Sequence, residues 1–270
     1  MNKKQLLSEP IKHIDITQGK YAFMVSLIDE MENMAFQARN LARGAKIFNA
    51  MQEDEDCTVY LTLAVSLVSA GLKKVIVDLV KENMVDVIVS TGANIVDQDF
   101  FEALGFRHYK GRLDIDDNLL REMGIDRIYD TFIDETELKQ CDQTIACICD
   151  NLHRQAYSSR EFIVEMGRYL ENDDRYSASR EESIVYQCYK KGVPIFVPAF
   201  SDCSAGFGLV KHKWDNPDFN LSIDSAKDFL EITKIKIEHT SSGIFMIGGG
   251  VPKNFVQDIV VAAEIVGKEV

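Results

Sequence analysis

The sequence is poor in the residues that interrupt regular structure. Its 270 residues include 5 prolines, 16 glycines and a single tryptophan, Trp214. So few prolines and glycines exclude a linker-rich or intrinsically disordered chain. Hydrophobic residues make up 46% of the chain and charged residues 27%, which is typical of a globular protein with a sizeable core.

Positive charge and long apolar runs are also scarce. With 30 basic and 43 acidic side chains, the net charge is −13. This balance argues against nucleic acid or an anionic membrane as a partner, because phosphate binding needs clustered Lys and Arg, and it suits a polycationic ligand. No stretch approaches 18 apolar residues, and the first ten residues lack the apolar segment of a secretory signal. We therefore expect no membrane partner.

The cysteines and histidines show no metal-binding pattern. No pair of cysteines has the Cys-x-x-Cys spacing, Cys147-x-Cys149 is too tight for the usual zinc site, and no two histidines are four residues apart. We predict no metal, reduced thiols and a cytoplasmic location, because disulfides belong to oxidising compartments. The residues concerned are Cys57, Cys141, Cys147, Cys149, Cys188 and Cys203, and His13, His108, His153, His212 and His239.

Apolar runs alternate with amphipathic stretches after residue 56. Residues 58–65 read as a strand buried on both faces, and 72–83 as a helix with apolar residues at helical spacing. Residues 85–89 form the next predicted strand, and a helix follows through Leu104. Strand, helix, strand, helix is the order typical of a parallel sheet with crossover helices.

The pattern returns in the second half of the chain. Strands are predicted at 193–197 and, buried, at 244–247, with helices at about 224–238 and 252–266. Two Ser-x-x-Glu sequences, 158–161 and 179–182, fit capping boxes that open helices.

The first fifty residues read as helical over 21–49. We predict an α/β fold, with a Rossmann-like parallel sheet, flanking helices and a helical N-terminal segment. The domain prediction is a single domain over 1–270, with the helical segment at 1–56 and an α/β core at 57–270.

Small and polar residues follow three predicted strands, at 90–93, 201–206 and 248–250. Ligands bind beyond the carboxyl ends of parallel strands, and glycine lets backbone N–H groups approach a phosphate. The triple glycine is not the dinucleotide motif Gly-x-Gly-x-x-Gly, and a tight strand-to-helix turn explains it as well. Three such ends together favour a ligand site.

Charged residues lie just past these strand ends. Asp97 can accept hydrogen bonds from ribose hydroxyls, or it can stabilise a helix N-terminus. Asp202 can orient a cofactor or hold an amine, or it can cap the next turn. Lys253 can reach a phosphate or point into solvent. The residues alone leave these alternatives open.

Three stretches resemble the deoxyhypusine synthase family. They are 83–92 (NMVDVIVSTG), 193–202 (VPIFVPAFSD) and 247–253 (IGGGVPK), and the resemblance runs from about residue 30 to the C-terminus. It implies a Rossmann-like fold, NAD as cofactor, and a homotetramer with sites at subunit interfaces. It also implies transfer of the aminobutyl group of spermidine, through an imine on a lysine, to an acceptor amine. That acceptor is a protein lysine or, in several bacterial relatives, putrescine.

The resemblance assigns the cofactor site position by position. The first cofactor loop falls on 66–69, although the family's Ser-Asn start reads Val65-Ser66 here, and the ribose-binding acid falls on Asp97, which follows Val96 instead of a second acid. The implied cofactor-binding residues are Ser66, Ser69, Thr91, Gly92, Ala93, Asp97, Asp202, Ser204, Gly248 and Gly249.

The polyamine half of the family pattern matches less well. Asp97, Phe207 and Asn254 are the implied substrate-binding positions, but the family has an aspartate where Phe207 stands and a histidine where Asn254 stands. Phenylalanine cannot pair a buried ammonium, so substrate recognition must differ from that of the eukaryotic enzyme. The sequence around the glycines looks more like the bacterial branch, which favours putrescine as acceptor.

The family's catalytic lysine has no counterpart here and would lie beyond Val270. We expect the chain to be a C-terminally incomplete fragment, because a sheet stopped there exposes the edge of a strand. The alternative is a family member that cannot perform lysine–imine chemistry. The predicted activity is an NAD-dependent aminobutyl transferase acting on spermidine or a related polyamine, and the alternative function is a non-catalytic NAD- or polyamine-binding protein.

Overall fold

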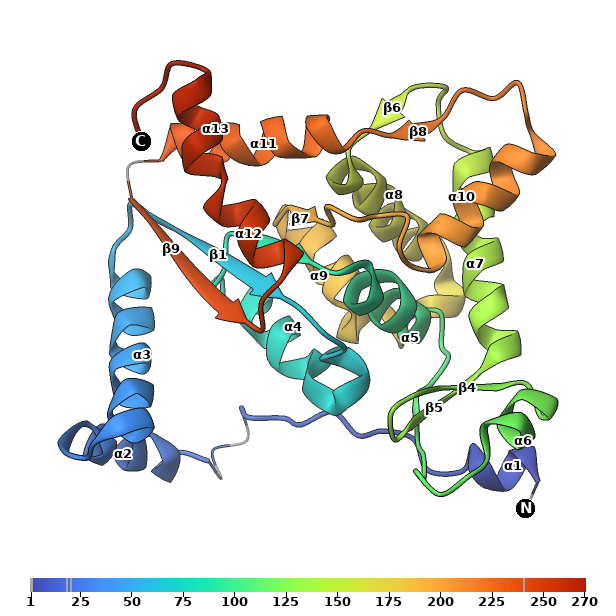
Figure 1. The fold of residues 1–270 in the computed structure, drawn as a ribbon, viewed down its shortest axis with the longest axis horizontal. Helices are drawn as coiled ribbons and strands as arrows, with labels where there is room; N and C mark the ends of the chain where they lie inside the picture. The colour runs from blue at the N-terminus through green and yellow to red at the C-terminus, as the bar shows by residue number, and fades with distance from the viewer. Residues whose placement is uncertain (1, 18, 20, 240) are drawn as a thin grey trace.

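The computed structural model describes residues 2–17, 19, 21–239 and 241–270. Its centre is a parallel sheet with the strand order β7-β2-β1-β9, and helices surround this sheet (Figure 1). The strands are β1 (Cys57–Leu63), β2 (Val87–Ser90), β7 (Ile195–Phe196) and β9 (Ser241–Ile247). The predicted α/β class with a Rossmann-like parallel sheet is confirmed.

The side chains of β1 alternate between two cores. Val59, Leu61 and Leu63 belong to the larger core on one face of the sheet, and Tyr60 belongs to the smaller core on the other. Because successive side chains of a strand point to opposite faces, a strand covered on both faces must be apolar throughout. This is the physical reason for the continuous apolar run in the sequence.

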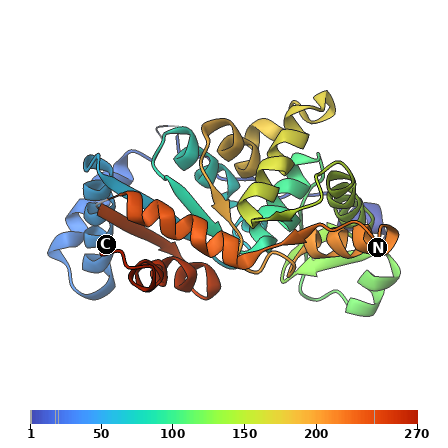
Figure 2. The same cartoon turned by 90° about the horizontal axis from the view of Figure 1, so that it is seen from above.

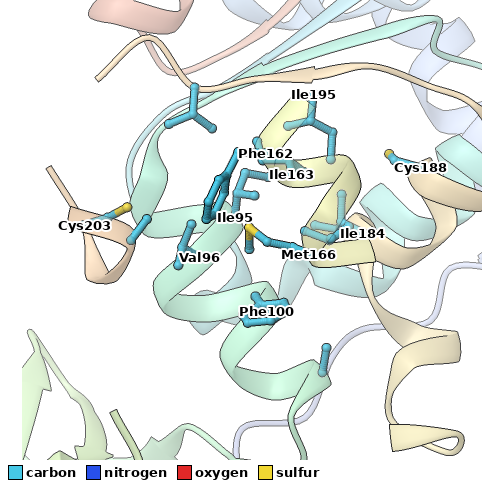
Figure 3. Close-up of a cluster of buried hydrophobic side chains, with 14 of the residues drawn as sticks. Ile95, Val96, Phe100, Phe162, Ile163, Met166, Ile184, Cys188, Ile195 and Cys203 are labelled. Carbon is cyan, nitrogen blue, oxygen red and sulfur yellow. The ribbon is translucent and has the colours of Figure 1, made fainter. Parts of the chain in front are cut away.

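The larger core is packed by helices from the middle of the chain. They are α4 (Lys73–Lys81), α8 (Ser159–Glu171) and α9 (Ile184–Lys191), and a π-helical segment, η3 (Ala93–Phe100), that continues as α5 (Phe101–Ala103). A second π-helical turn, η2 (Val68–Leu72), leads into α4. Figure 3 shows Val96 and Phe100 of η3 beside Phe162 and Met166 of α8, all of them fully buried.

Three helices near the C-terminus cover the other face. They are α11 (Ser225–Glu238), α12 (Val251–Gln257) and α13 (Ile259–Ile265), and they lie across the sheet from the larger core (Figure 2). The predicted helix at 224–238 is confirmed. The helix predicted at 252–266 is two helices, because Asp258 ends one and begins the next.

The N-terminal segment forms α1 (Lys3–Leu6), α2 (Phe23–Glu30), the short η1 (Met31–Asn33) and α3 (Phe36–Glu53). The prediction of helix within 21–49 is confirmed. The ring of Phe48 on α3 lies 4.8 Å from the ring of Phe245 on β9, so α3 packs beside the last strand (Figure 1). The division at residue 56 stays a prediction.

The segment between α5 and α8 contains elements that the sequence did not predict. An antiparallel sheet has the order β3 (Tyr109–Lys110), β5 (Thr131–Asp134), β4 (Ile125–Ile128), with α6 (Asp117–Glu122) beside it. Phe132 is the centre of a small core there, with Leu6, Leu120 and Ile125. Strands this short carry too few alternating positions to be seen in a sequence.

The remaining elements join this part to the main sheet. α7 (Glu135–Asp150) packs against α10 (Ser204–Asp215), where Gly208 lies so close to Ile145 that a Cβ on Gly208 would be 2.6 Å from the Ile145 Cβ. A two-stranded parallel pair joins β6 (Ala156–Tyr157) to β8 (Ser222–Ile223), and the short turns are η4 (Asp174–Tyr176) and η5 (Arg180–Glu182).

One of the two predicted capping boxes is confirmed and the other is wrong. The Ser158 hydroxyl accepts the N–H of Glu161 at 3.1 Å, and the Glu161 carboxylate accepts the N–H of Ser158 at 3.0 Å. The Ser179 hydroxyl instead donates to the carbonyl of Ala103 at 2.5 Å, and α9 begins after Ser183. A tertiary hydrogen bond therefore replaces the local one.

The last strand is less buried than predicted. β9 pairs with β1 alone among the described strands, and Met246 is 45% exposed. The apolar run at 244–247 belongs to an edge strand, which corrects its reading as a fully buried strand. No helix of the described residues is both long enough and apolar enough to cross a membrane.

Candidate functional site

Three parallel strands end at the same level. Leu63 of β1 is in register with Ser90 of β2 and with Ile247 of β9. Hydrogen bonds continue just past these residues, since the Ala64 N–H donates to the Ile247 carbonyl at 3.0 Å and the Thr91 N–H donates to the Leu63 carbonyl at 3.2 Å. The loops that follow the three strands are thereby held side by side.

A cavity of about 390 Å³ opens at this edge of the sheet. We call it the strand-end cavity, and it is lined by residues 64–66, 90–93, 198–199, 202 and 249–252. This volume and this position match what α/β proteins use for small ligands. Six residues that the sequence analysis assigned to cofactor binding line it: Ser66, Thr91, Gly92, Ala93, Asp202 and Gly249.

The glycines differ in their physical role. A Cβ on Gly92 would overlap the Sγ of Cys203 and lie 2.8 Å from its Cβ, so Gly92 allows the loop after β7 to pack against the turn after β2. A Cβ on Gly249 would meet no atom within 4 Å. Packing within the chain therefore requires glycine at 92 but leaves open space at 249.

Gly248 and Ser69 shape the site without lining the cavity. Gly248 has φ 84°, a left-handed conformation that favours glycine, and it turns the chain directly after β9. Ser69 is 2% exposed; its N–H donates to the side chain of Gln98 at 2.9 Å and its hydroxyl to the Ser66 carbonyl at 3.2 Å. Neither residue lines the cavity.

Two residues that shape the site were not identified from the sequence. Asn94 is fully buried; its side chain accepts the Leu67 N–H at 2.8 Å and donates to the Thr91 hydroxyl at 3.2 Å, which ties two of the loops together. Val65 lines the cavity at φ 65°, where a β-branched residue is strained. No sequence pattern marks either role, because both depend on which loops become neighbours.

Carboxylates gather beside the cavity. Asp97 accepts the backbone N–H of Ser204, the first residue of α10, at 2.6 Å. Asp97 itself belongs to η3, and its carboxylate lies at the N-terminus of a different helix, α10. Burial raises its pKa to about 6, against the hydrogen bonds from Ser204, and the charges of Asp142 and Asp202 raise it further.

Asp142 on α7 is a further residue that the sequence did not reveal. Burial raises its pKa as well, and its Oδ1 is buried without a hydrogen-bond partner among the described residues. Ser204 hydrogen-bonds to both Asp97 and Asp142, so the start of α10 links two acids from different elements. The result is a strongly negative region beside the strand ends.

The two altered substrate positions lie outside the strand-end cavity. Phe207 on α10 is 68% exposed, and Asn254 on α12 is also exposed. Neither these residues nor Lys253 line the cavity, and no lysine of the described residues does. The structure therefore brings six of the implied cofactor positions together and leaves Phe207 and Asn254 on the surface.

A second polar cluster lies apart from the residues that line the cavity. The Glu102 carboxylate accepts from Lys73 Nζ at 2.5 Å and pairs at 2.8 Å with His13 Nε2 and with His108 Nδ1. Glu102, Lys73 and His108 are each at most 2% exposed. This arrangement fastens the N-terminal segment to α4 and α5.

Fold and site together define an α/β protein of the Rossmann-like class, with a candidate ligand site at the carboxyl ends of its strands. The family model of deoxyhypusine synthase matches residues 26–269. The chain belongs to the deoxyhypusine synthase family.

Relatives agree with this assignment. A deoxyhypusine synthase-like protein from Chlorobaculum tepidum is 65% identical over 269 residues, which cover 100% of this chain and 75% of that protein. A probable deoxyhypusine synthase 2 from Methanosarcina acetivorans is 38% identical, again over 100% of this chain and 75% of the relative. A crystal structure titled "putative deoxyhypusine synthase" from Entamoeba histolytica has a TM-score of 0.63 at 21% identity, over 89% of this chain and 80% of that one, and supports the fold.

Proposed function

We propose that the protein is an NAD-dependent aminobutyl transferase that uses spermidine or a related polyamine. The acceptor is putrescine, which yields homospermidine, or a protein lysine, which yields deoxyhypusine. The observation that carries the proposal is the strand-end cavity, in which six of the implied cofactor residues meet, within a chain of the deoxyhypusine synthase family.

The residues around the cavity fit a dinucleotide. Gly249 leaves space for close approach of a phosphate, and Ser66 and Thr91 place hydroxyl groups on the wall. Asp97 and Asp202 are the acids that would hold ribose hydroxyls, although Asp97 already accepts one N–H from Ser204. When bound, NAD would take a hydride from the carbon next to the amine and later return it.

The carboxylates beside the cavity supply the chemistry for an amine. Asp97, Asp142 and Asp202 place negative charge where an ammonium group of a polyamine would approach. In the overall reaction the bond from the aminobutyl carbon to diaminopropane breaks, and a bond to the acceptor nitrogen forms. The nitrogen of the displaced diaminopropane gains the proton that the acceptor amine loses, and NAD is regenerated, so the exchange needs no net oxidant.

NAD binding and turnover test the two parts of this proposal separately. We expect the chain to bind NAD saturably in calorimetry, and the full-length protein to release diaminopropane from spermidine when NAD and putrescine are present. Gly249→Ala should weaken NAD binding about tenfold or more, since the added methyl enters open cavity space. Gly44→Ala on α3, which also meets nothing within 4 Å, is the matched control.

The outcomes separate the alternatives. Failure to bind NAD, or equal binding by Gly249→Ala and the parent chain, would contradict the cofactor site. NAD binding without any aminobutylated product would favour the non-catalytic NAD- or polyamine-binding protein. That alternative is supported by the absence of a described lysine from the cavity wall and by the exposed positions of Phe207 and Asn254.

Assembly and location are further parts of the proposal. We propose a homotetramer with its sites near subunit interfaces, in the cytoplasm. The exposed apolar side chains of α2 and α3, among them Phe23, Val25 and Phe36, are compatible with a subunit contact. Sedimentation equilibrium at micromolar concentration should give four times the mass of the chain, and a monomer would contradict the tetramer.

A further inference from the structure

A second cavity, of about 440 Å³, lies next to the strand-end cavity. We call it the side cavity. Its wall is formed by the loop after β7, by α10 and by the start of α11, and includes Ser201, Lys213, Ser225 and Asp228. Residues 198 and 199 line both cavities, so the two cavities share this part of their walls.

Asp228 of α11 is the unusual residue of the side cavity. It is 1% exposed, and its Oδ1 accepts the N–H of Arg160 at the start of α8, at 3.3 Å. Its Oδ2 is buried and has no hydrogen-bond partner among the described residues. Burial raises the pKa of Asp228 to about 6, and the nearby charge of Glu231 adds to this, while hydrogen bonds from Ser159 and Arg160 lower it. Burying a carboxylate oxygen without a partner is unfavourable, and this cost favours binding of a donor.

The charges around Asp228 do not balance within the chain. The Arg160 guanidinium donates to Glu231 at 2.6 Å, and the Lys227 ammonium donates to Glu161 at 2.5 Å. Both neighbouring cations are therefore engaged by other carboxylates, which leaves Asp228 as the acid in excess. Asp228 and its neighbours therefore lack a cation that could pair with the Asp228 carboxylate.

Lys213 does not supply that cation in the structure. It lines the side cavity, but it is exposed and forms no ion pair with any described residue. A cationic ligand that enters the cavity would not have to displace an ion pair of Lys213, and the exposed lysine side chain can extend away from it into solvent. Ser201 and Ser225 offer further hydroxyl acceptors along the wall.

We propose that the side cavity binds an ammonium group of an amine ligand, and that Asp228 is its counter-charge. The inference rests on the proposed function in one respect: the amine is the polyamine or the acceptor amine of the transfer. The shared wall at 198–199 places such an amine beside the proposed cofactor.

Binding of putrescine and spermidine to the whole chain, measured by calorimetry with and without NAD, tests the proposal. Asp228→Asn keeps an oxygen that can accept the Arg160 N–H and removes the charge. We expect it to weaken amine binding at least tenfold and to leave NAD binding within twofold. Asp224→Asn is the matched control, because Asp224 caps the same helix, does not line the side cavity, and is replaced by an equally good cap.

A second variant covers the case in which Asp228→Asn does not fold. Ser225→Leu fills the cavity from an exposed position and leaves the carboxylate in place. It should weaken amine binding at least fivefold at an unchanged melting temperature. Parent-like amine affinity in a folded Asp228→Asn, or an equal loss in Asp224→Asn, would overturn the proposal. Amine binding that depends on Asp228 in a chain that does not bind NAD would uphold the side cavity and refute the cofactor proposal.

Discussion

Asp97 and Glu102 belong to one continuous helical run, η3 and α5, and burial acts on both, yet their pKa values move in opposite directions. Burial alone would raise the pKa of Glu102, but hydrogen bonds from His108 and His13 and the charge of Lys73 hold it well below its usual range. Asp97 is buried, accepts the N–H of Ser204 and has other acids as neighbours, so its pKa rises to about 6.

The difference separates structural charge from charge that is available to a ligand. The Glu102 cluster has its counter-charges within the chain and connects three segments. Beside the strand ends, carboxylates face one another without enough cations. Such an arrangement is costly unless a ligand compensates it, which is why perturbed acids beside a cavity indicate a site. Two predictions test this contrast and two more test the loops after the strands, in order from the largest expected effect to the smallest.

Removing the charge of Glu102 should have the largest effect on stability. We expect Glu102→Gln to lower the free energy of unfolding by about 3 to 5 kcal/mol, because the buried Lys73 would lose the carboxylate with which it pairs. Denaturant unfolding measures this. Glu9→Gln, at an exposed pair with Lys110, should change stability by less than about 1 kcal/mol. Equal effects of the two variants would show that the buried cluster does not hold the fold.

Asp97 should make the protein more stable as the pH falls. Its pKa is about 6 in the folded chain and 3.8 in the unfolded reference, so the folded state binds the proton more tightly. Its contribution to stability therefore increases as the pH falls from about 6 to about 4, by roughly 1 to 3 kcal/mol. Asp97→Asn should remove this part of the pH dependence of the melting temperature. Asp228 acts in the same direction, so the double variant should have the flattest profile.

Gly92 and Gly249 should respond differently to the same added methyl group. Gly92→Ala forces the loop after β7 away from Cys203 and should cost about 1 to 3 kcal/mol of stability. Gly249→Ala should leave the melting temperature unchanged, since its Cβ meets no atom within 4 Å. Thermal unfolding of the two variants checks this. A stable Gly92→Ala would mean that the loop can move away at little cost.

Val65 should be improved by a residue that tolerates the left-handed region. Val65→Asn relieves the strain of a β-branched side chain at φ 65° and should stabilise the fold by about 1 kcal/mol. Val210→Asn, at a similarly exposed position of α10 within ordinary helix, is the control and should not stabilise. A loss of stability in Val65→Asn would show that the valine side chain contributes packing that outweighs the strain.

Local patterns predicted much of the fold. The apolar run at 58–65 predicted a strand of the main sheet, because a strand that is buried on both faces must be apolar throughout. The helix at 224–238 was also predicted correctly. Asp224 and Ser158 predicted helix starts correctly. Ser179 did not, because its hydroxyl bonds to Ala103, far away in the chain. The short strands β3, β4 and β5 carry too little pattern to be predicted.

The sequence by itself determined the α/β class, the acidic balance and the motifs that place the chain in its family. Only the tertiary structure decided how the acids differ, since Asp97, Asp142 and Asp202 come from separate segments. The same holds for Asn94 between two loops and for the unpartnered oxygen of Asp228. The spacing of apolar residues along a helix or strand indicates which of its sides is buried. Whether an acidic side chain is buried next to another charge depends on the distances between segments that are far apart in the sequence, and only the folded structure fixes those distances.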